Sequence, residues 1–263
     1  KEYSKEIKAL EAMGLNITNI DALDRELCAD AEDELQEIRV HMEAESQTSP
    51  LGVRQLNVES SFLPEDAYML RPSWTALFSD KDLNDELTGG SELEAQAVIS
   101  GEGCKNYWNW AKGGGWGCSG GVGSNQQWAE WGFWFRPKVS KYYSVIPHFQ
   151  FRGFYIVRAN DKWYNCKKAE VKISAWTNVH QYNWKGWNHV DVLHVRDDNI
   201  NVNKRFDTNR NTYNSYLLGG GDWAFIRCTI GLYVRAQGSG SYAENNFSSG
   251  SANRLCVPYV NVY

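Results

Sequence analysis

After residue 100, hydrophobic and polar positions alternate along most of the chain. Segments rich in β-branched and aromatic residues lie at 131–137, 142–159, 169–176, 188–195, 200–206, 222–236 and 256–263. Turn-forming stretches such as RDDN and LGGGD separate them, and no long helical stripe interrupts them. We therefore expect residues 101–263 to form one Trp-rich, antiparallel β-sandwich domain that is jelly-roll-like.

Before residue 100 the hydrophobic pattern has a longer period. Apolar side chains recur every three or four residues, at Leu23, Leu27, Ala31, Leu35, Ile38 and Met42. This spacing is typical of one face of an α-helix, so we expect residues 1–100 to be an acidic, mostly helical N-terminal region or extension. Its apolar face either packs on the rest of the protein or joins several chains in a homo-oligomeric stalk.

Charge divides the chain at the same place. The whole chain has a net charge of −5, but residues 1–100 contain 22 acidic and 8 basic groups, which gives −14. Residues 101–263 contain 10 acidic and 19 basic groups, which gives +9. The two regions therefore attract one another, and the acidic region is a candidate cover for a basic face of the second.

Cysteine usage bears on the compartment. Six cysteines stand at positions 28, 104, 118, 166, 228 and 256, without a CxxC pair, which disfavours a zinc ribbon. We expect disulfides between Cys104 and Cys118 and between Cys228 and Cys256, and hence a secreted or cell-surface location. The remaining two cysteines either pair or stay free. No run of about 18 apolar residues exists, so we expect no transmembrane helix.

Tryptophan is concentrated in the segment 104–137, which holds six of the twelve tryptophans of the chain. In a strand, side chains alternate between the two faces, so Trp131, Phe133 and Phe135 should share the core face. Trp134 should point the opposite way. Trp163, Trp176 and Trp223 also stand in strand patterns, and we expect them in the core as well.

Other tryptophans stand in polar, loop-like segments, where large rings are rarely fully buried. Exposed rings of this kind usually mark a binding site, and their flat faces with neighbouring amides suit pyranose sugars. The candidate ligand-binding residues are Trp108, Trp110, Trp116, Tyr182, Asn183, Trp184, Trp187 and Asn188.

Candidate catalytic and metal-binding patterns are weaker. Residues 117–121 match G-x-S-x-G only formally, because no strand-turn-helix surrounds the serine. His189 and Asp191 should share a strand face with His194 on the other, which argues against a metal cluster. Asp197 and Asp198 are a weak candidate for calcium, since the glycine and glutamate of a calcium loop are missing.

These patterns favour a secreted or surface-exposed, non-enzymatic binding module that is lectin-like and recognises a glycan or surface polysaccharide. One alternative is the structural or adhesive head of an oligomeric surface or matrix protein. Another is a secreted glycoside hydrolase, although the spacing pairs no two carboxylates. Nucleic acid is disfavoured because the basic residues are scattered. We assign no catalytic residue and no cofactor.

Overall fold

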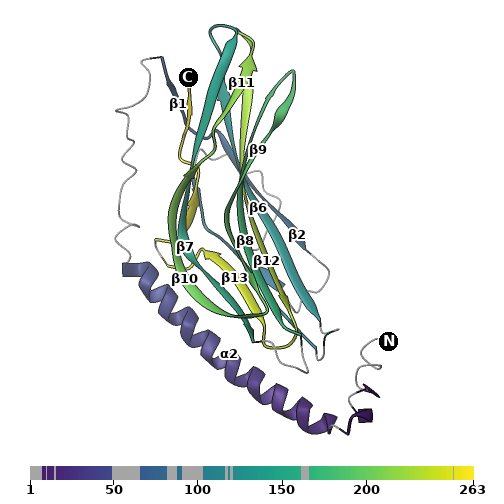
Figure 1. The fold of residues 1–263 in the computed structure, drawn as a ribbon. Coiled ribbons are helices and arrows are strands. Elements are labelled where there is room, and N and C mark those ends of the chain that lie inside the picture. The colour runs from purple at the N-terminus through teal and green to yellow at the C-terminus, as the bar shows by residue number, and fades with distance from the viewer. Residues whose placement is uncertain are drawn as a thin grey trace.

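The chain is mainly β, with its strands in two antiparallel sheets that face each other (Figure 1). The computed structural model describes residues 8–9, 11–14, 16–48, 66–81, 88–90, 103–115, 118, 121–160, 166–250 and 252–263. Within these ranges, no helix combines the length and apolar character needed to cross a membrane.

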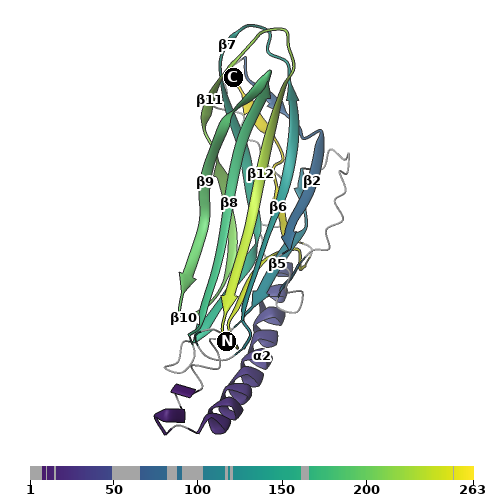
Figure 2. The same cartoon turned by 90° about the vertical axis from the view of Figure 1, so that its right-hand side faces the viewer.

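The first sheet has five strands, which Figure 2 shows face-on. In spatial order they are β2 (Trp74–Lys81), β6 (Val122–Phe135), β12 (Ala224–Gln237), β8 (Lys168–Gln181) and β9 (Asn183–Asp197). All neighbours are antiparallel, and β12 occupies the centre. The outer face of this sheet carries the candidate site.

The second sheet is organised around the 20-residue strand β7 (Lys141–Asn160). Its main path is β1 (Tyr68–Leu70), β15 (Val260–Val262), β7, β13 (Tyr242–Phe247), β5 (Tyr107–Lys112) and β3 (Thr88–Gly90). The remaining strands are β10 (Asn199–Asn211), β11 (Asn214–Leu218), β14 (Arg254–Cys256) and β4 (Cys104–Lys105). Because β7 is long, different parts of it pair with β10, β11, β13, β14 and β15.

The core lies between the sheets and follows the alternation of the strands. Trp131 and Phe133 of β6 are fully buried and belong to one cluster with Phe149 and Phe151 of β7. Trp134 points outward and is 51% exposed. The predicted core face of this strand is therefore confirmed.

The expectation that Trp176 and Trp223 are core residues is wrong, and Trp163 lies outside the described residues. Trp176 lies half-buried on the outer face of β8, and Trp223 is 59% exposed just before β12. The pattern around both residues is that of a strand, but a strand has two faces, and the inward positions of β8 and β12 are taken by smaller aliphatic side chains.

A largely helical N-terminal region is not supported. The helix α2 (Ile17–Thr48) runs along the outside of the second sheet, but the described residues that follow it form β1, β2 and β3 (Figure 1). These strands pair with β15, β6 and β5. Strand edges leave backbone groups without partners, so apolar segments such as WTALF are drawn into the sheets. Whether residue 100 separates two domains stays a prediction.

The helix is held to the sheet by apolar contacts and by charge. Leu35 and Met42 pack against Phe154, Ile156 and Tyr242. This contact uses part of the apolar stripe that was a candidate for oligomerisation, and the homo-oligomer stays a prediction. Ion pairs join Arg39 to Glu244, with 3.0 Å between Nε and Oε2, and Glu34 to Arg158.

The disulfides differ from the expected pairs. Cys104 bonds Cys256, and Cys118 bonds Cys166. Cys104 and Cys256 stand directly opposite each other on β4 and β14, and the chain after Cys104 leaves at once along β5, away from Cys118. Cys228 is a free thiol, fully buried in the core, and burial raises its pKa. Two disulfides are consistent with an extracellular location.

The ion pair of Arg39 offers a test of how the helix is attached. Replacing Arg39 with Ala should lower the free energy of unfolding by about 2–3 kcal/mol, because it leaves the carboxylate of Glu244, which is 1% exposed, without its cation. Glu34→Ala removes a more exposed ion pair and should cost less than about 1 kcal/mol. Urea unfolding of both variants measures this, and equal costs would contradict it.

Candidate ligand-binding site

A cavity of about 680 Å³ opens on the outer face of the five-stranded sheet. Because strand residues alternate, the positions between the buried residues of β6, β12 and β8 point outward here. The cavity is lined by Trp128, Glu130, Trp176, Trp187, His189, Arg227 and Thr229. We call it the sheet pocket.

Glycine in the central strand makes room for the aromatic floor. A Cβ atom at Gly231 of β12 would lie 2.5 Å from Cη2 and Cζ3 of Trp176 and 3.3 Å from Cδ1 of Trp128. The ring of Trp176 therefore lies across the strand where the side chain is missing. Glycine inside a strand often marks such a close approach.

A β-bulge brings two tryptophans of β9 to the pocket side. Residues three apart normally face opposite ways, but Trp184 pairs with His180 and Trp187 with Asn178, so one extra residue is inserted. Gly186 lies in the bulge with φ at 109°, a value that favours glycine. The rings of Trp184 and Trp187 are consequently stacked, with centroids 6.5 Å apart.

A second bulge, between Ile173 and Ser174 of β8, overturns the expected placement of His194. Lys172 pairs with His194 and Ser174 with Asp191, so His194 shares the outer face with Asp191. Nε2 of His194 lies at hydrogen-bond distance from Oε1 of Glu170, 2.9 Å, and Asp191 makes an ion pair with Lys172 at 3.1 Å. The alternation assumed from sequence failed because the bulge shifts it by one residue.

Arg227 contacts the rings of both Trp184 and Trp187. Its guanidinium carbon lies 4.4 Å from the ring centroid of Trp184 and 4.5 Å from that of Trp187, which is a double cation–π contact. Its Nη1 is 4.0 Å from Oε1 of Glu130. One side chain thus connects the rings of β9 to the carboxylate of β6.

Glu130 has an altered acidity. Burial raises the pKa of its carboxyl, and the opposing effects are the charge of Arg227 and the hydrogen bond donated by Oγ1 of Thr229 at 3.3 Å. Among the described residues that line the pocket, Glu130 is the one carboxylate.

His189 and its partners close the other side. Its ring stacks on Trp176, with centroids 5.3 Å apart, and its Nε2 lies 2.9 Å from Oδ1 of Asp191. Oδ1 of Asp191 also accepts a hydrogen bond from Ser174. The imidazole is therefore fixed between Trp176 and Asp191.

Of the predicted ligand-binding residues at 182–188, one lines this pocket. Trp187 lines it, and Trp184 adjoins it through Arg227. Tyr182 stands at the turn between β8 and β9, and its hydroxyl donates to Asp222. Asn183 is exposed at the start of β9. Asn188 donates to the carbonyl of Tyr213 at 2.8 Å, away from the pocket.

The predicted ligand-binding residues Trp108 and Trp110 lie elsewhere. Trp108 and Trp110 are not in a loop closed by a disulfide but on strand β5 of the second sheet. With Arg39 of α2 and Tyr242 of β13 they line a different cavity, of about 590 Å³. Trp116 lies outside the described residues. The structure therefore does not bring the two groups of tryptophans together.

Metal binding gains no support from the geometry. Among the described residues, no group of three or more His, Cys, Asp or Glu side chains could hold a metal ion. Oδ1 of Asp197 accepts hydrogen bonds from the amides of Asp198 at 2.8 Å and Asn199 at 3.4 Å, and these bonds lower its pKa. The carboxylate thus closes the β9–β10 turn.

Most of the residues that line the pocket were not predicted from sequence to bind the ligand. Those residues are Trp128, Glu130, Trp176, His189, Arg227 and Thr229. A signal did exist, because polar or aromatic residues recur at the outward positions of QWAEW and FIRCTIG. What the sequence does not show is which strands lie side by side.

Comparisons with known proteins do not assign a family. No family model matches the chain, and no curated protein matches it. Among solved structures, TmCBM61 in complex with β-1,4-galactotriose is 12% identical over 76% of this chain and 88% of its own, with a TM-score of 0.17. The isomalto-dextranase of Arthrobacter globiformis T6, complexed with panose, is 10% identical over 74% and 34%, with a TM-score of 0.18. Likenesses this weak carry no argument.

The raised pKa of Glu130 predicts a pH-dependent effect of Glu130→Gln. The folded protein binds this proton more tightly than the unfolded chain, so ionisation costs stability as pH rises from the ordinary value of 4.5 through the folded pKa. Glutamine has no such cost. The free energy of unfolding of the variant, minus that of the wild type, should therefore increase with pH across this window. Urea titrations at several pH values measure it, and a flat or falling difference would contradict it.

Proposed function

We propose that this protein binds carbohydrate in the sheet pocket and acts as a secreted or surface-exposed, lectin-like module on a jelly-roll-like β-sandwich. The observation that carries the proposal is the combination of three tryptophan rings with fixed polar groups in one cavity. Trp128, Trp176 and Trp187 supply the rings. Glu130 and Arg227 supply hydrogen-bonding groups beside them.

The chemistry of this lining matches that of a sugar ring. A pyranose has flat C–H faces and a hydroxyl-bearing edge, so it needs apolar ring faces and polar groups side by side. The volume of about 680 Å³ falls within the range of roughly 300–1,000 Å³ that is common for small-ligand sites. A nucleobase could also stack here, but the described lining has Arg227 as its one permanent cation, and that cation is already close to Glu130.

The pocket is arranged before a ligand arrives. Arg227 fixes Trp184 and Trp187, and Asp191 fixes His189, which stacks on Trp176. All of these side chains stand on strands rather than loops. A preorganised site of this kind loses little conformational entropy on binding, which favours affinity.

Binding without catalysis is the better account of the same residues. Glycoside hydrolysis commonly uses two carboxyl groups on either side of the scissile bond. The described lining provides only Glu130, and Asp191 is engaged by Lys172, Ser174 and His189. A hydrolase, or an adhesive head on an oligomeric stalk, remains the alternative that the experiment below distinguishes.

The test is loss of sugar affinity in Trp187→Ala. Removing one stacking ring should weaken binding by about 1–3 kcal/mol, or about 5- to 150-fold, by analogy with base stacking on aromatic rings. A glycan array with the full chain identifies the ligand, and titration calorimetry then compares the variants. Trp223→Ala is the matched control, because Trp223 is similarly exposed but lies outside the pocket.

Each outcome has a clear meaning. Equal losses in both variants would show that the ring at the pocket has no special role. Unchanged binding in Trp187→Ala and Trp176→Ala together would refute the site. Turnover of the glycan that disappears in Glu130→Gln would favour the hydrolase. A blank array with folded protein would favour the adhesive head.

A further inference from the structure

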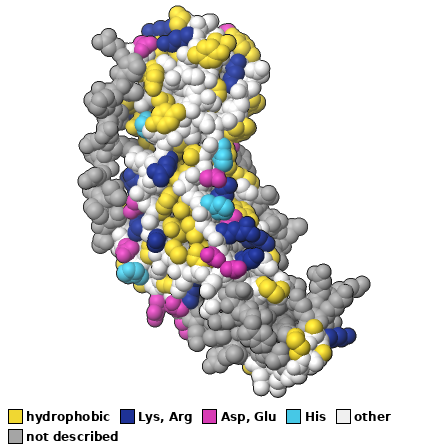
Figure 3. Space-filling view, viewed as in Figure 1, with side chains coloured by type: hydrophobic (Ala, Val, Ile, Leu, Met, Phe, Trp, Pro, Cys, Tyr) yellow, Lys and Arg dark blue, Asp and Glu magenta, His cyan; other side chains and the backbone are white. Residues whose placement is uncertain are grey.

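Apart from the sheet pocket, the end of the molecule farthest from α2 carries a group of exposed apolar side chains. We call this group the aromatic tip, and more than half of each of its side chains is exposed. Its members are Trp134, Val139, Tyr142, Tyr182, Leu217 and Trp223. Figure 3 shows hydrophobic and basic side chains together at this end.

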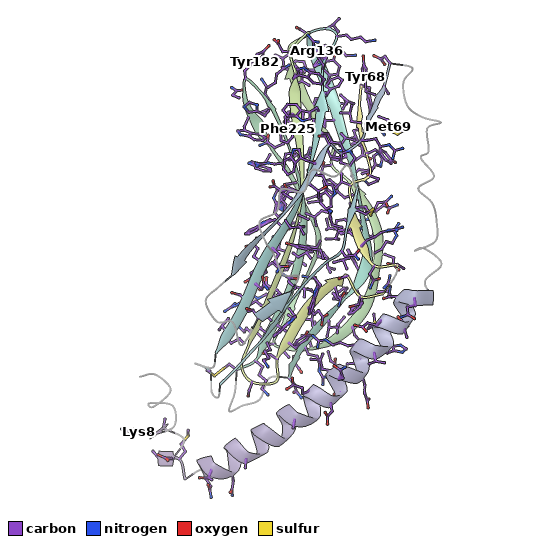
Figure 4. The ribbon with its side chains drawn as sticks, turned by 180° about the vertical axis from the view of Figure 1, so that it is seen from behind. Lys8, Tyr68, Met69, Arg136, Tyr182 and Phe225 are labelled. Atoms are coloured by element: carbon purple, nitrogen blue, oxygen red, sulfur yellow. A yellow bond between two sulfur atoms is a disulfide. The ribbon has the colours of Figure 1, made fainter. Side chains whose placement is uncertain are left out.

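The aromatic tip is built by three loops that meet at one place. These are 136–140 between β6 and β7, the turn at Tyr182 between β8 and β9, and 219–223 between β11 and β12. Figure 4 shows Arg136 and Tyr182 at this end, far from the helix. Tyr142 and Leu217 stand directly opposite each other on β7 and β11. Trp134 and Trp223 are in edge contact, with centroids 6.4 Å apart.

Hydrogen bonds make the tip a fixed surface. Nε of Arg136 donates to the carbonyl of Gly221 at 2.6 Å, and the amide of Gly221 donates to the carbonyl of Pro137 at 2.8 Å. Nε2 of Gln181 donates to the carbonyls of Gly219 and Asp222 at 3.0 and 3.1 Å. Each loop is thereby joined to another. The apolar side chains therefore stay exposed although the loops that carry them are anchored by hydrogen bonds.

The charges around the tip favour an anionic surface. Three basic side chains, Arg136, Lys138 and Lys141, stand on or beside the first loop. The guanidinium of Arg136 lies 6.0 Å from the ring of Trp223. Two acids stand nearby: Asp222 accepts the hydroxyl of Tyr182, and Asp66 pairs with Lys141 at 3.1 Å. Three basic and two acidic groups therefore leave this end with a net charge of +1.

We propose that the aromatic tip docks on the surface of a lipid bilayer that contains anionic lipids. Tryptophan and tyrosine have an apolar body and a polar edge, and they are enriched at the headgroup level of membranes. Basic residues next to such rings add attraction to anionic lipids. The tip ends the molecule in short loops, a shape that meets a planar, deformable surface. Docking this way leaves the sheet pocket on the side of the molecule.

The experiment is sedimentation of the full chain with glycan-free vesicles of phosphatidylcholine and phosphatidylserine at about three to one. We expect the wild type to sediment with these vesicles more than with pure phosphatidylcholine, and less as salt increases. The double variant Leu217→Ser, Trp223→Ser should lose about tenfold in partitioning, because it removes two exposed apolar anchors. Trp187→Ala should partition like the wild type.

The controls separate this proposal from the carbohydrate site. The vesicles carry no sugar, so a damaged pocket cannot change the result, and a failed glycan array does not bear on it. Circular dichroism confirms that each variant is folded, and Val139→Ser, Tyr142→Ser replaces the first double variant if that one unfolds. Wild-type protein that stays in the supernatant would overturn the proposal. A protein would then be the alternative partner of this surface. Tip variants that partition to the same extent as the wild type would overturn it as well.

Discussion

The position of β12 in the middle of the five-stranded sheet is the constraint on which the structure depends. Its inward side chains, from Ala224 to Ala236, are fully buried against the second sheet. A slip of one residue would turn this whole row to solvent, so burial fixes the register of β12 with β6 and β8. That register places Thr229 between Glu130 and Trp176, and Gly231 between Trp128 and Ser174. The core on one face thus sets the pocket on the other.

The same residue type has three roles in this fold, according to which way the strand turns it. Trp131 fills the core, Trp128 and Trp176 line the sheet pocket, and Trp223 projects from the aromatic tip. Glycine decides where a ring can lie flat, because its missing Cβ leaves space above the strand. The cost of glycine within a strand is offset where a large ring covers it, as Trp176 covers Gly231.

Two ion pairs of opposite polarity attach the helix: Glu34–Arg158 has the signs expected from the charges of the two regions, and in Arg39–Glu244 the signs are reversed. The ion pairs of Glu34 with Arg158 and of Arg39 with Glu244 join the acidic region to the second sheet. They accompany apolar contacts of Leu35 and Met42, which keep water away from part of the interface. Both the sheet pocket and the aromatic tip lie outside this covered area. The helix therefore leaves both proposed binding surfaces open.

The sequence by itself determined the local features. Alternation identified the strands and the buried face of Trp131, and the helical period identified the apolar stripe of α2, because both depend only on neighbouring residues. The tertiary structure alone decided the disulfide partners, the location of Trp108 on another sheet and the grouping of the pocket residues. The bulge opposite Ser174 also reversed the expected face of His194. Pairing between strands distant in sequence depends on burial of the whole core, and no local pattern contains that information.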